Sequence, residues 1–98
     1  MNITLTVPQE FVLCPAISPK AKMLWLVIRA FALERQNEMV CESVDTLSTA
    51  IGVKKDTFRK YSDELQDMGL LRVIQRKQIG RFMENGYIAV EFRQEAAQ

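Results

Sequence analysis

The 98-residue sequence contains no histidine and only two cysteines, and these absences exclude several kinds of chemistry. Without histidine the chain lacks the commonest general base and metal ligand, and it has no Ser-His or Cys-His nucleophile pair. Cys14 and Cys41 do not form a Cys-x-x-Cys motif. We therefore expect a non-enzymatic protein with two buried free thiols, without disulfide, bound metal, cofactor or small-molecule ligand.

Long hydrophobic runs are also missing. The longest apolar stretch, residues 23–28, stops at Arg29 and is far shorter than the roughly 20 residues that cross a bilayer. The N-terminal sequence MNITLTVPQE lacks the basic and apolar regions of a signal peptide. The sequence therefore predicts a cytoplasmic protein with no membrane partner.

Neither sign of charge is in excess, because 13 Lys and Arg oppose 12 Asp and Glu. The resulting formal charge of +1 excludes a polybasic tail, so any basic site has to be local. A hydrophobic content of 48% is ordinary for one soluble domain, and the length excludes two. A chain this short buries only about two-thirds of its unfolded surface, so self-association would add stability.

An arm and a long helix are expected in the first part of the chain. Residues 1–17 combine scattered apolar residues with Pro8 and Pro15, which predicts an extended arm with one short strand or turn. Ser18 followed by Pro19 is typical of a helix start, and we expect a helix from there to about Gln36. Its apolar residues form two stripes: Leu24, Trp25, Ile28, Phe31 and Ala32, and on another side Met23, Leu26, Ala30 and Leu33.

The second of these stripes has two explanations. Either the N-terminal arm folds over it within one chain, or a second subunit covers it. The latter predicts a symmetric homodimer with Met23, Leu26, Ala30 and Leu33 at its interface.

Two shorter helices are expected next. The first opens at Ser43 and ends at Gly52, whose permissive backbone suits a sharp turn. The next runs over residues 55–68, with Gly69 just beyond its end. Their inward positions are Leu47, Ala50 and Ile51 in the first, and Phe58, Tyr61, Leu65 and Met68 in the second. The β-prone segments are residues 39–41, 70–77 and 87–92, the last two forming a hairpin around a polar tip.

This order of elements resembles the winged helix-turn-helix superfamily. The stretch SVDTLSTAIGVKKDTFRKYSDELQDMGLL, residues 43–71, has apolar residues and glycines at the family's usual positions. SPKAKMLWLVI before it and NGYIAV after it are similar to small domains of plasmid and phage replication initiators and regulators. The resemblance implies an α+β, mainly α, domain of three helices and a β-hairpin wing over residues 18–92, between the arm (1–17) and a polar tail (93–98).

Lys54 departs from the family pattern, in which Ser or Thr often precedes the third helix. Lysine accepts no hydrogen bond, so the helix start forgoes a cap worth roughly 1 kcal/mol. A cation at the positive end of the helix dipole adds a small penalty. Such a cost is understandable if Lys54 and the open N–H groups meet a phosphate; the alternative is a tolerated surface lysine.

Basic residues gather in the two elements that the winged fold uses for DNA. Residues 54–61 carry a net charge of +3 and residues 72–83 carry +4, whereas residues 1–53 sum to −1. Clustered basic charge releases counterions from phosphates, so clustering matters more than the total charge. The sequence therefore predicts double-stranded DNA as a partner, although a solvated charged face is the alternative.

The resemblance assigns roles to these side chains. With the third helix in the major groove, the residues near base edges would be Lys55, Arg59 and Lys60. Phosphates would be held by Ser43, Lys54 and Thr57, and the wing residues Arg76, Lys77 and Arg81 would contact phosphate or the minor groove. Two function classes stay open: a dimeric, sequence-specific DNA-binding protein in transcription regulation or replication initiation, and a protein-interaction module acting on a host complex.

Overall fold

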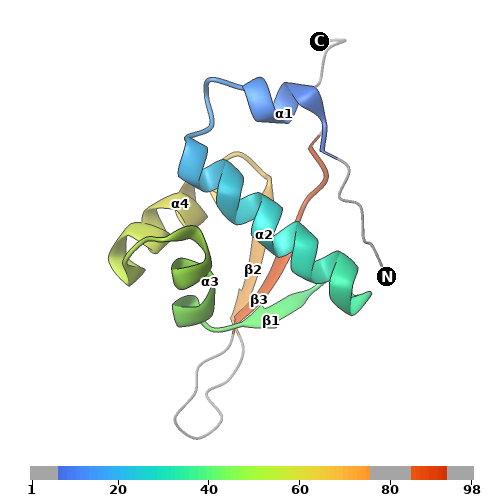
Figure 1. The fold of residues 1–98 in the computed structure, drawn as a ribbon, viewed down its shortest axis with the longest axis vertical. Coiled ribbons are helices and arrows are strands. Elements are labelled where there is room, and N and C mark those ends of the chain that lie inside the picture. Colours follow the sequence, from blue (N-terminus) through green and yellow to red (C-terminus); the bar gives the residue numbers. More distant parts are fainter. Residues whose placement is uncertain (1–6, 76–84, 93–98) are drawn as a thin grey trace, which may run out of the picture.

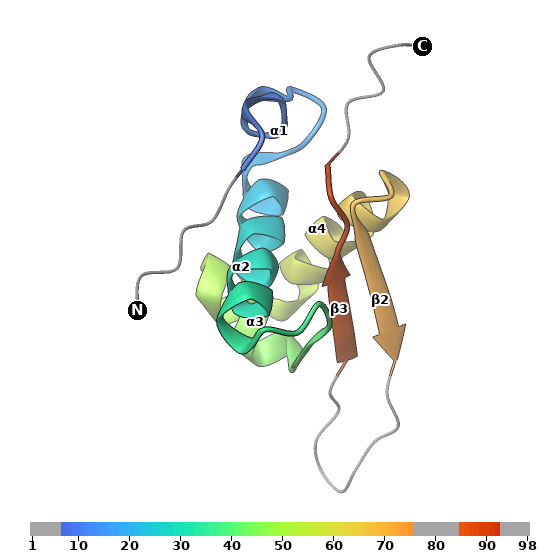
Figure 2. The same ribbon diagram turned by 90° about the vertical axis from the view of Figure 1, so that its right-hand side faces the viewer.

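The computed structural model describes residues 7–75 and 85–92, so the predictions for residues 1–6, 76–84 and 93–98 lie outside the described part. The elements in chain order are α1 (Gln9–Leu13), α2 (Pro19–Arg35), β1 (Val40–Glu42), α3 (Val44–Ile51), α4 (Lys55–Asp67), β2 (Leu71–Gln75) and β3 (Asn85–Ala89). The strands form an antiparallel sheet in the order β1-β3-β2. Helices α2, α3 and α4 pack together beside this sheet, and α1 lies beyond the start of α2 (Figures 1 and 2). The predicted α+β, mainly helical class is confirmed.

Helix α2 begins where the sequence predicts and ends one residue earlier. At its start the Ser18 hydroxyl accepts a hydrogen bond from the Ala21 N–H, and Pro19 is the first helical residue. At its end Gln36 adopts a left-handed conformation with φ of 54°, which closes the helix without a glycine. No helix of the described residues is long and apolar enough to cross a membrane.

The turn between α3 and α4 depends on Gly52, which has φ of 73° and caps the end of α3. Lys20 of α2 reinforces this end, because its Nζ donates a hydrogen bond of 2.8 Å to the carbonyl of Ile51. After the turn α4 begins at Lys55, and Gly69, also at φ of 73°, follows its end as predicted. These two glycines set the relative direction of the elements on either side of α4.

Aromatic side chains join the helices to the sheet. Trp25 of α2 is buried and donates an Nε1–H hydrogen bond of 3.0 Å to the carbonyl of Val90. Its ring lies 4.6 Å from that of Phe11, centroid to centroid, and Phe11 in turn contacts Phe92 at 5.5 Å. Among the described residues, the other buried apolar side chains are Ile17, Ala21, Leu24, Ile28, Val40, Leu47, Ile51, Phe58, Leu65, Leu70, Leu71, Tyr87 and Ala89.

The prediction of an extended N-terminal arm with one strand or turn is wrong for residues 9–13, which form the helix α1. A five-residue helix is too short to be stable by itself. Phe11 stabilises it here, since its side chain is fully buried against Trp25 and Phe92. The described residues therefore contain a fourth helix in addition to the three that were predicted.

Other local predictions also need correction. Ala50, predicted to face inward, is exposed, because the inward side of α3 is formed by Leu47, Ser48 and Ile51. Met68 is 40% exposed, because it follows the last residue of α4 as its C-cap and leaves the inward stripe. Cys14 and Cys41, predicted to be buried, are both partly exposed.

The sheet differs from the predicted hairpin in its strand limits. Strand β3 begins at Asn85 and ends at Ala89, two and three residues before the predicted limits. The shift follows from its pairing on both edges, with Val40–Glu42 of β1 on one side and Leu71–Gln75 of β2 on the other. The β-prone segment after α2 is thus part of the same sheet as the hairpin.

Candidate nucleic-acid interface

The first turns of α3 and α4 are joined by an ion pair. Nζ of Lys55, the first residue of α4, lies 2.8 Å from Oδ1 of Asp45 in the first turn of α3. Both side chains are largely exposed, at 61% and 68%. The structure therefore brings together two helix N-termini, each of which carries the partial positive charge of unpaired N–H groups.

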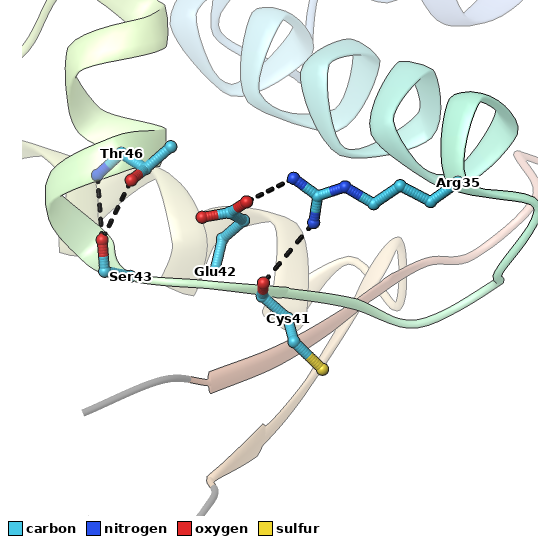
Figure 3. A network of polar contacts seen from close by, with 5 residues as sticks. All are labelled: Arg35, Cys41, Glu42, Ser43 and Thr46. Atoms are coloured by element: carbon cyan, nitrogen blue, oxygen red, sulfur yellow. Dashed lines mark hydrogen bonds and ion pairs between the residues drawn. The ribbon is translucent and has the colours of Figure 1, made fainter. Parts of the chain in front are cut away.

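The start of α3 is fixed by a network of polar contacts (Figure 3). Ser43 is the N-cap, and its Oγ accepts a hydrogen bond of 3.2 Å from the Thr46 N–H and lies 3.1 Å from the Thr46 hydroxyl. Next to it, the Arg35 guanidinium pairs with the Glu42 carboxylate and also donates to the carbonyl of Cys41. These contacts tie the end of α2 and the strand β1 to the start of α3. Ser43, predicted to hold a phosphate, is thus already engaged as a helix cap.

The start of α4 lacks such a cap. Lys54 occupies the N-cap position, its side chain is exposed and it makes no capping hydrogen bond. The N–H groups of residues 55–57 have no acceptor within the helix, because each lies less than four residues from its start. An uncapped helix start with lysines on it is a ready position for an anion.

Burial defines which sides of α4 are open. Phe58, Ser62 and Leu65 are buried and mark the inward side. With 3.6 residues per turn, Lys60 lies nearly opposite them, and Lys55 and Arg59 lie one turn apart on a flank. All three basic side chains are exposed, and Lys60 has its Nζ 5.7 Å from the centroid of the Tyr61 ring. Thr57 is half-buried on the other flank.

Charge is separated along α4. Residues 54–61 carry four basic side chains and one acid, whereas residues 62–68 carry only acids, namely Asp63, Glu64 and Asp67. Helices are stabilised by the opposite order, because the N-terminal end is the positive end of the macrodipole. The order in α4 therefore costs helix stability.

The base of the wing is built closely around a glycine. A Cβ on Gly86 of β3 would lie 2.6 Å from the Met39 sulfur, so only glycine fits this position without a shift. Tyr87 beside it is buried, with its ring 6.3 Å from that of Phe58, and burial raises the pKa of its phenol above the usual 10.0. A hydrogen bond from the Asn85 amide opposes this rise in pKa.

The predicted wing contacts cannot be located on this base. Arg76, Lys77 and Arg81 lie outside the described residues. The described part of β2 contributes one exposed basic side chain, that of Arg72.

The second apolar stripe of α2 is largely open within the described chain. Met23 and Leu33 are 41% and 39% exposed and Ala30 is exposed, whereas Leu26 is partly buried against the core. In the described part of the arm, residues 7–17, Phe11 and Ile17 are buried, and Phe11 packs on Trp25 of the first stripe instead.

Sequence reasoning missed one member of this site. Asp45 was not assigned to the interface from the sequence, yet it pairs with Lys55 across the turn. Opposite charges in the first turns of two helices joined by a short turn are the signal that could have indicated this pair. Among the described residues, no group of three or more His, Cys, Asp or Glu side chains could hold a metal ion.

Comparison with known proteins identifies one matching domain family and similar solved structures. Residues 16–71 match the family model of a helix-turn-helix domain. A solved structure described as the N-terminal domain of a DNA-binding protein is 19% identical, with a TM-score of 0.63 over 97% of this chain and 88% of that one. A possible transcriptional regulator from Methanosarcina mazei Go1 is 13% identical, with a TM-score of 0.56 over 85% of this chain and 65% of that one. No curated protein sequence matches the chain.

Proposed function

Because this chain belongs to the helix-turn-helix domain family, in its winged form, we propose that it binds double-stranded DNA in a sequence-specific manner as a homodimer. It would act as a transcriptional regulator or as the DNA-binding domain of a replication initiator. The names of the two similar structures, a DNA-binding protein and a possible transcriptional regulator, agree with this proposal.

The order of charge along α4 is the observation that carries the proposal. Each charge placed against the helix dipole costs about 0.3–1 kcal/mol at an exposed position. A helix under selection for stability alone would have acids at Lys54 and Lys55 and a base at Asp67. The reverse order suits a helix that meets phosphates with its N-terminal half and keeps its acidic half away from the DNA backbone.

Individual roles follow from the exposed positions on this N-terminal half. Arg59 is the proposed base reader, because its planar guanidinium can donate two parallel hydrogen bonds to guanine. Lys60 and Lys55 would lie near base edges on either side of it. Lys54 and the open N–H groups of α4 would hold one phosphate, with Thr57 beside them.

The flanking contacts complete the proposed interface. Ser43 would contact the backbone through its hydroxyl hydrogen while its oxygen caps α3. Arg76, Lys77 and Arg81 of the wing would hold phosphates or enter the minor groove.

The proposed dimer uses the open stripe of α2. Met23, Leu26, Ala30 and Leu33 would meet their counterparts across a two-fold axis, which would remove an apolar surface from water. Two copies of α4 would then enter successive major grooves about 34 Å apart, and the binding site would be palindromic.

Selection of bound duplexes from a random-sequence pool, at two salt concentrations, tests the function. We expect enrichment of one palindromic motif that binds more tightly than a scrambled duplex at both salt concentrations. Absence of enrichment, with equal and weak binding of all duplexes, would overturn the proposal. That result would favour the protein-interaction module.

A further inference from the structure

Asp45 is an acidic residue on the proposed DNA-binding surface. It lies in the first turn of α3 and pairs with Lys55, which we assign to the same surface. We propose that Asp45 is a specificity-determining residue that neutralises Lys55 and thereby weakens phosphate-driven binding to non-target duplexes. This inference rests on the proposed function.

Stability does not account for the pair. Both side chains are more than 60% exposed, and exposed ion pairs contribute little to the free energy of folding. The dipole of α3 explains an acid in its first turn, but not a contact of 2.8 Å to the first residue of the next helix. The pair instead balances the positive charge of Lys55 with the carboxylate of Asp45, and it directs the Lys55 side chain toward α3.

The consequence for DNA follows from the charge at this position. A phosphate that approaches Lys55 either displaces the carboxylate or meets it at close range. In both cases Asp45 removes the gain that a free lysine would give through counterion release. Non-target complexes depend on phosphate contacts alone, so they lose the most.

The target complex is affected less. There, base contacts of Arg59 and Lys60 on α4 would fix the docking position, and the Lys55–Asp45 pair can stay intact near the base edges beside Arg59. A repulsive element that penalises the wrong partner more than the right one raises specificity. Asp45 would therefore widen the ratio between target and non-target affinities.

The substitution Asp45→Asn tests this inference, because asparagine keeps the size and removes the charge. Dissociation constants are measured on the selected duplex and on a scrambled duplex between 50 and 200 mM salt. On scrambled DNA we expect a salt slope steeper by about 0.9, which is about eightfold tighter binding at 0.1 M salt. On the selected duplex we expect a smaller gain, so that the specificity ratio falls.

Asp67→Asn is the matched control. Asp67 is the last residue of α4, and twelve residues at 1.5 Å each place it about 18 Å from the position of Lys55. This distance exceeds the Debye length of about 10 Å at 0.1 M salt, so the control should bind like the wild type. Thermal unfolding of both variants verifies that the fold is intact.

A double-mutant cycle with Lys55→Met isolates the pair. In the wild type, where Asp45 already neutralises the lysine, Lys55→Met should change scrambled-duplex affinity less than twofold. In the Asp45→Asn background the same change should remove the whole eightfold gain, since each neutralised phosphate contributes about 0.9 to the salt slope.

Several results would overturn the inference. One is an equal gain in affinity of Asp45→Asn on both duplexes, and another is equal behaviour of Asp45→Asn and Asp67→Asn. A third is weaker binding of the selected duplex by Asp45→Asn, which would make Asp45 a base-contacting residue. If the wild type itself selects no motif, the proposed function fails and the inference fails with it. If the wild type selects a motif but Asp45→Asn equals the control, only the inference fails.

Discussion

At the scale of single residues, Glu64 joins two helices. Its two carboxylate oxygens accept hydrogen bonds from the N–H and the hydroxyl of Ser18, at 2.7 and 2.8 Å, so a side chain of α4 holds the N-cap of α2. Ser18 Oγ in turn accepts from the Ala21 N–H. One carboxylate therefore supports the start of the longest helix from outside it.

Glu64→Ala should lower the free energy of unfolding by about 2 kcal/mol, because hydrogen bonds to a charged acceptor contribute about 1.5–3 kcal/mol. The control is Asp63→Ala, which removes an exposed acid from the neighbouring position and should change stability by about 0.5 kcal/mol or less. Urea denaturation midpoints measure both. Equal losses in the two variants would mean that the contact with Ser18 contributes nothing.

Tyr87 predicts a response to alkaline pH. Burial raises its pKa in the folded state above 10.0, whereas the unfolded chain ionises near the ordinary value. Above pH 10 the unfolded state therefore binds fewer protons than the folded state, and stability falls as pH rises. The contribution of Tyr87 is fully present below pH 10 and is lost as pH rises through its folded pKa.

Tyr87→Phe should flatten this alkaline decline in the free energy of unfolding, while costing about 1 kcal/mol at neutral pH through the lost hydrogen bond with Asn85. Urea melts at several pH values between 7 and 11 measure the slope for the variant and the wild type. An unchanged alkaline slope would contradict the role given to Tyr87.

Local sequence rules predicted which residues act at helix ends, but not the hydrogen bonds that these residues make with residues distant in the sequence. Ser18, Pro19, Gly52 and Gly69 act at helix ends as their residue types predict. The contact between Ser18 and Glu64 spans 46 residues of sequence. Such a pair depends on the packing of α2 against α4, and no spacing rule contains it.

At the scale of elements, the start of α4 predicts that a substitution can raise the stability of the fold while lowering the affinity for DNA. Lys54→Ser would supply the missing cap and remove a charge from the positive end of the helix, which should raise the free energy of unfolding by about 1 kcal/mol. The same change should weaken DNA binding, since a phosphate contact is lost. Denaturant midpoints and dissociation constants measured on one set of variants check both effects.

Lys54→Ala is the control for this pair of effects, because it removes the charge without adding a cap. It should weaken DNA binding as much as Lys54→Ser and stabilise the fold less. If Lys54→Ser is more stable and binds DNA like the wild type, Lys54 is a tolerated surface lysine.

Elements with a clear period or cap could be predicted, and short ones could not. The limits of α2 and α4 agree with prediction to within one residue, because the Ser18 cap of α2, the glycine after α4 and the apolar spacing of both helices are local signals. The helix α1 forms around one buried side chain, that of Phe11. The edge strand β1 joins the sheet by pairing with β3, which is a contact between segments distant in the sequence.

At the scale of the whole molecule, the open stripe of α2 predicts the oligomeric state. Leu33→Glu should convert a dimer into a monomer at tens of micromolar, because it places a charge in the proposed apolar interface. Leu33 is 39% exposed, so the subunit fold should survive. Sedimentation velocity gives the mass, and circular dichroism verifies the fold.

Ile74→Glu is the control, since Ile74 is an equally exposed apolar residue of β2, outside the stripe. It should leave the mass unchanged. A wild type that is monomeric at tens of micromolar would end the dimer proposal. The sequence could not decide between the N-terminal arm and a second subunit, because an apolar stripe indicates a covered surface but does not identify the segment or subunit that covers it.

The most direct test of the central claim is the specificity ratio of Arg59→Ala, measured as the dissociation constant on a scrambled duplex divided by that on the selected duplex. A side chain that reads a base contributes about 1–3 kcal/mol of discrimination, so the ratio should fall by about 5- to 150-fold relative to the wild type. Binding to the scrambled duplex should weaken far less, because it depends on phosphate contacts. Equal losses on the two duplexes would contradict the account of α4 as the element that reads the DNA sequence.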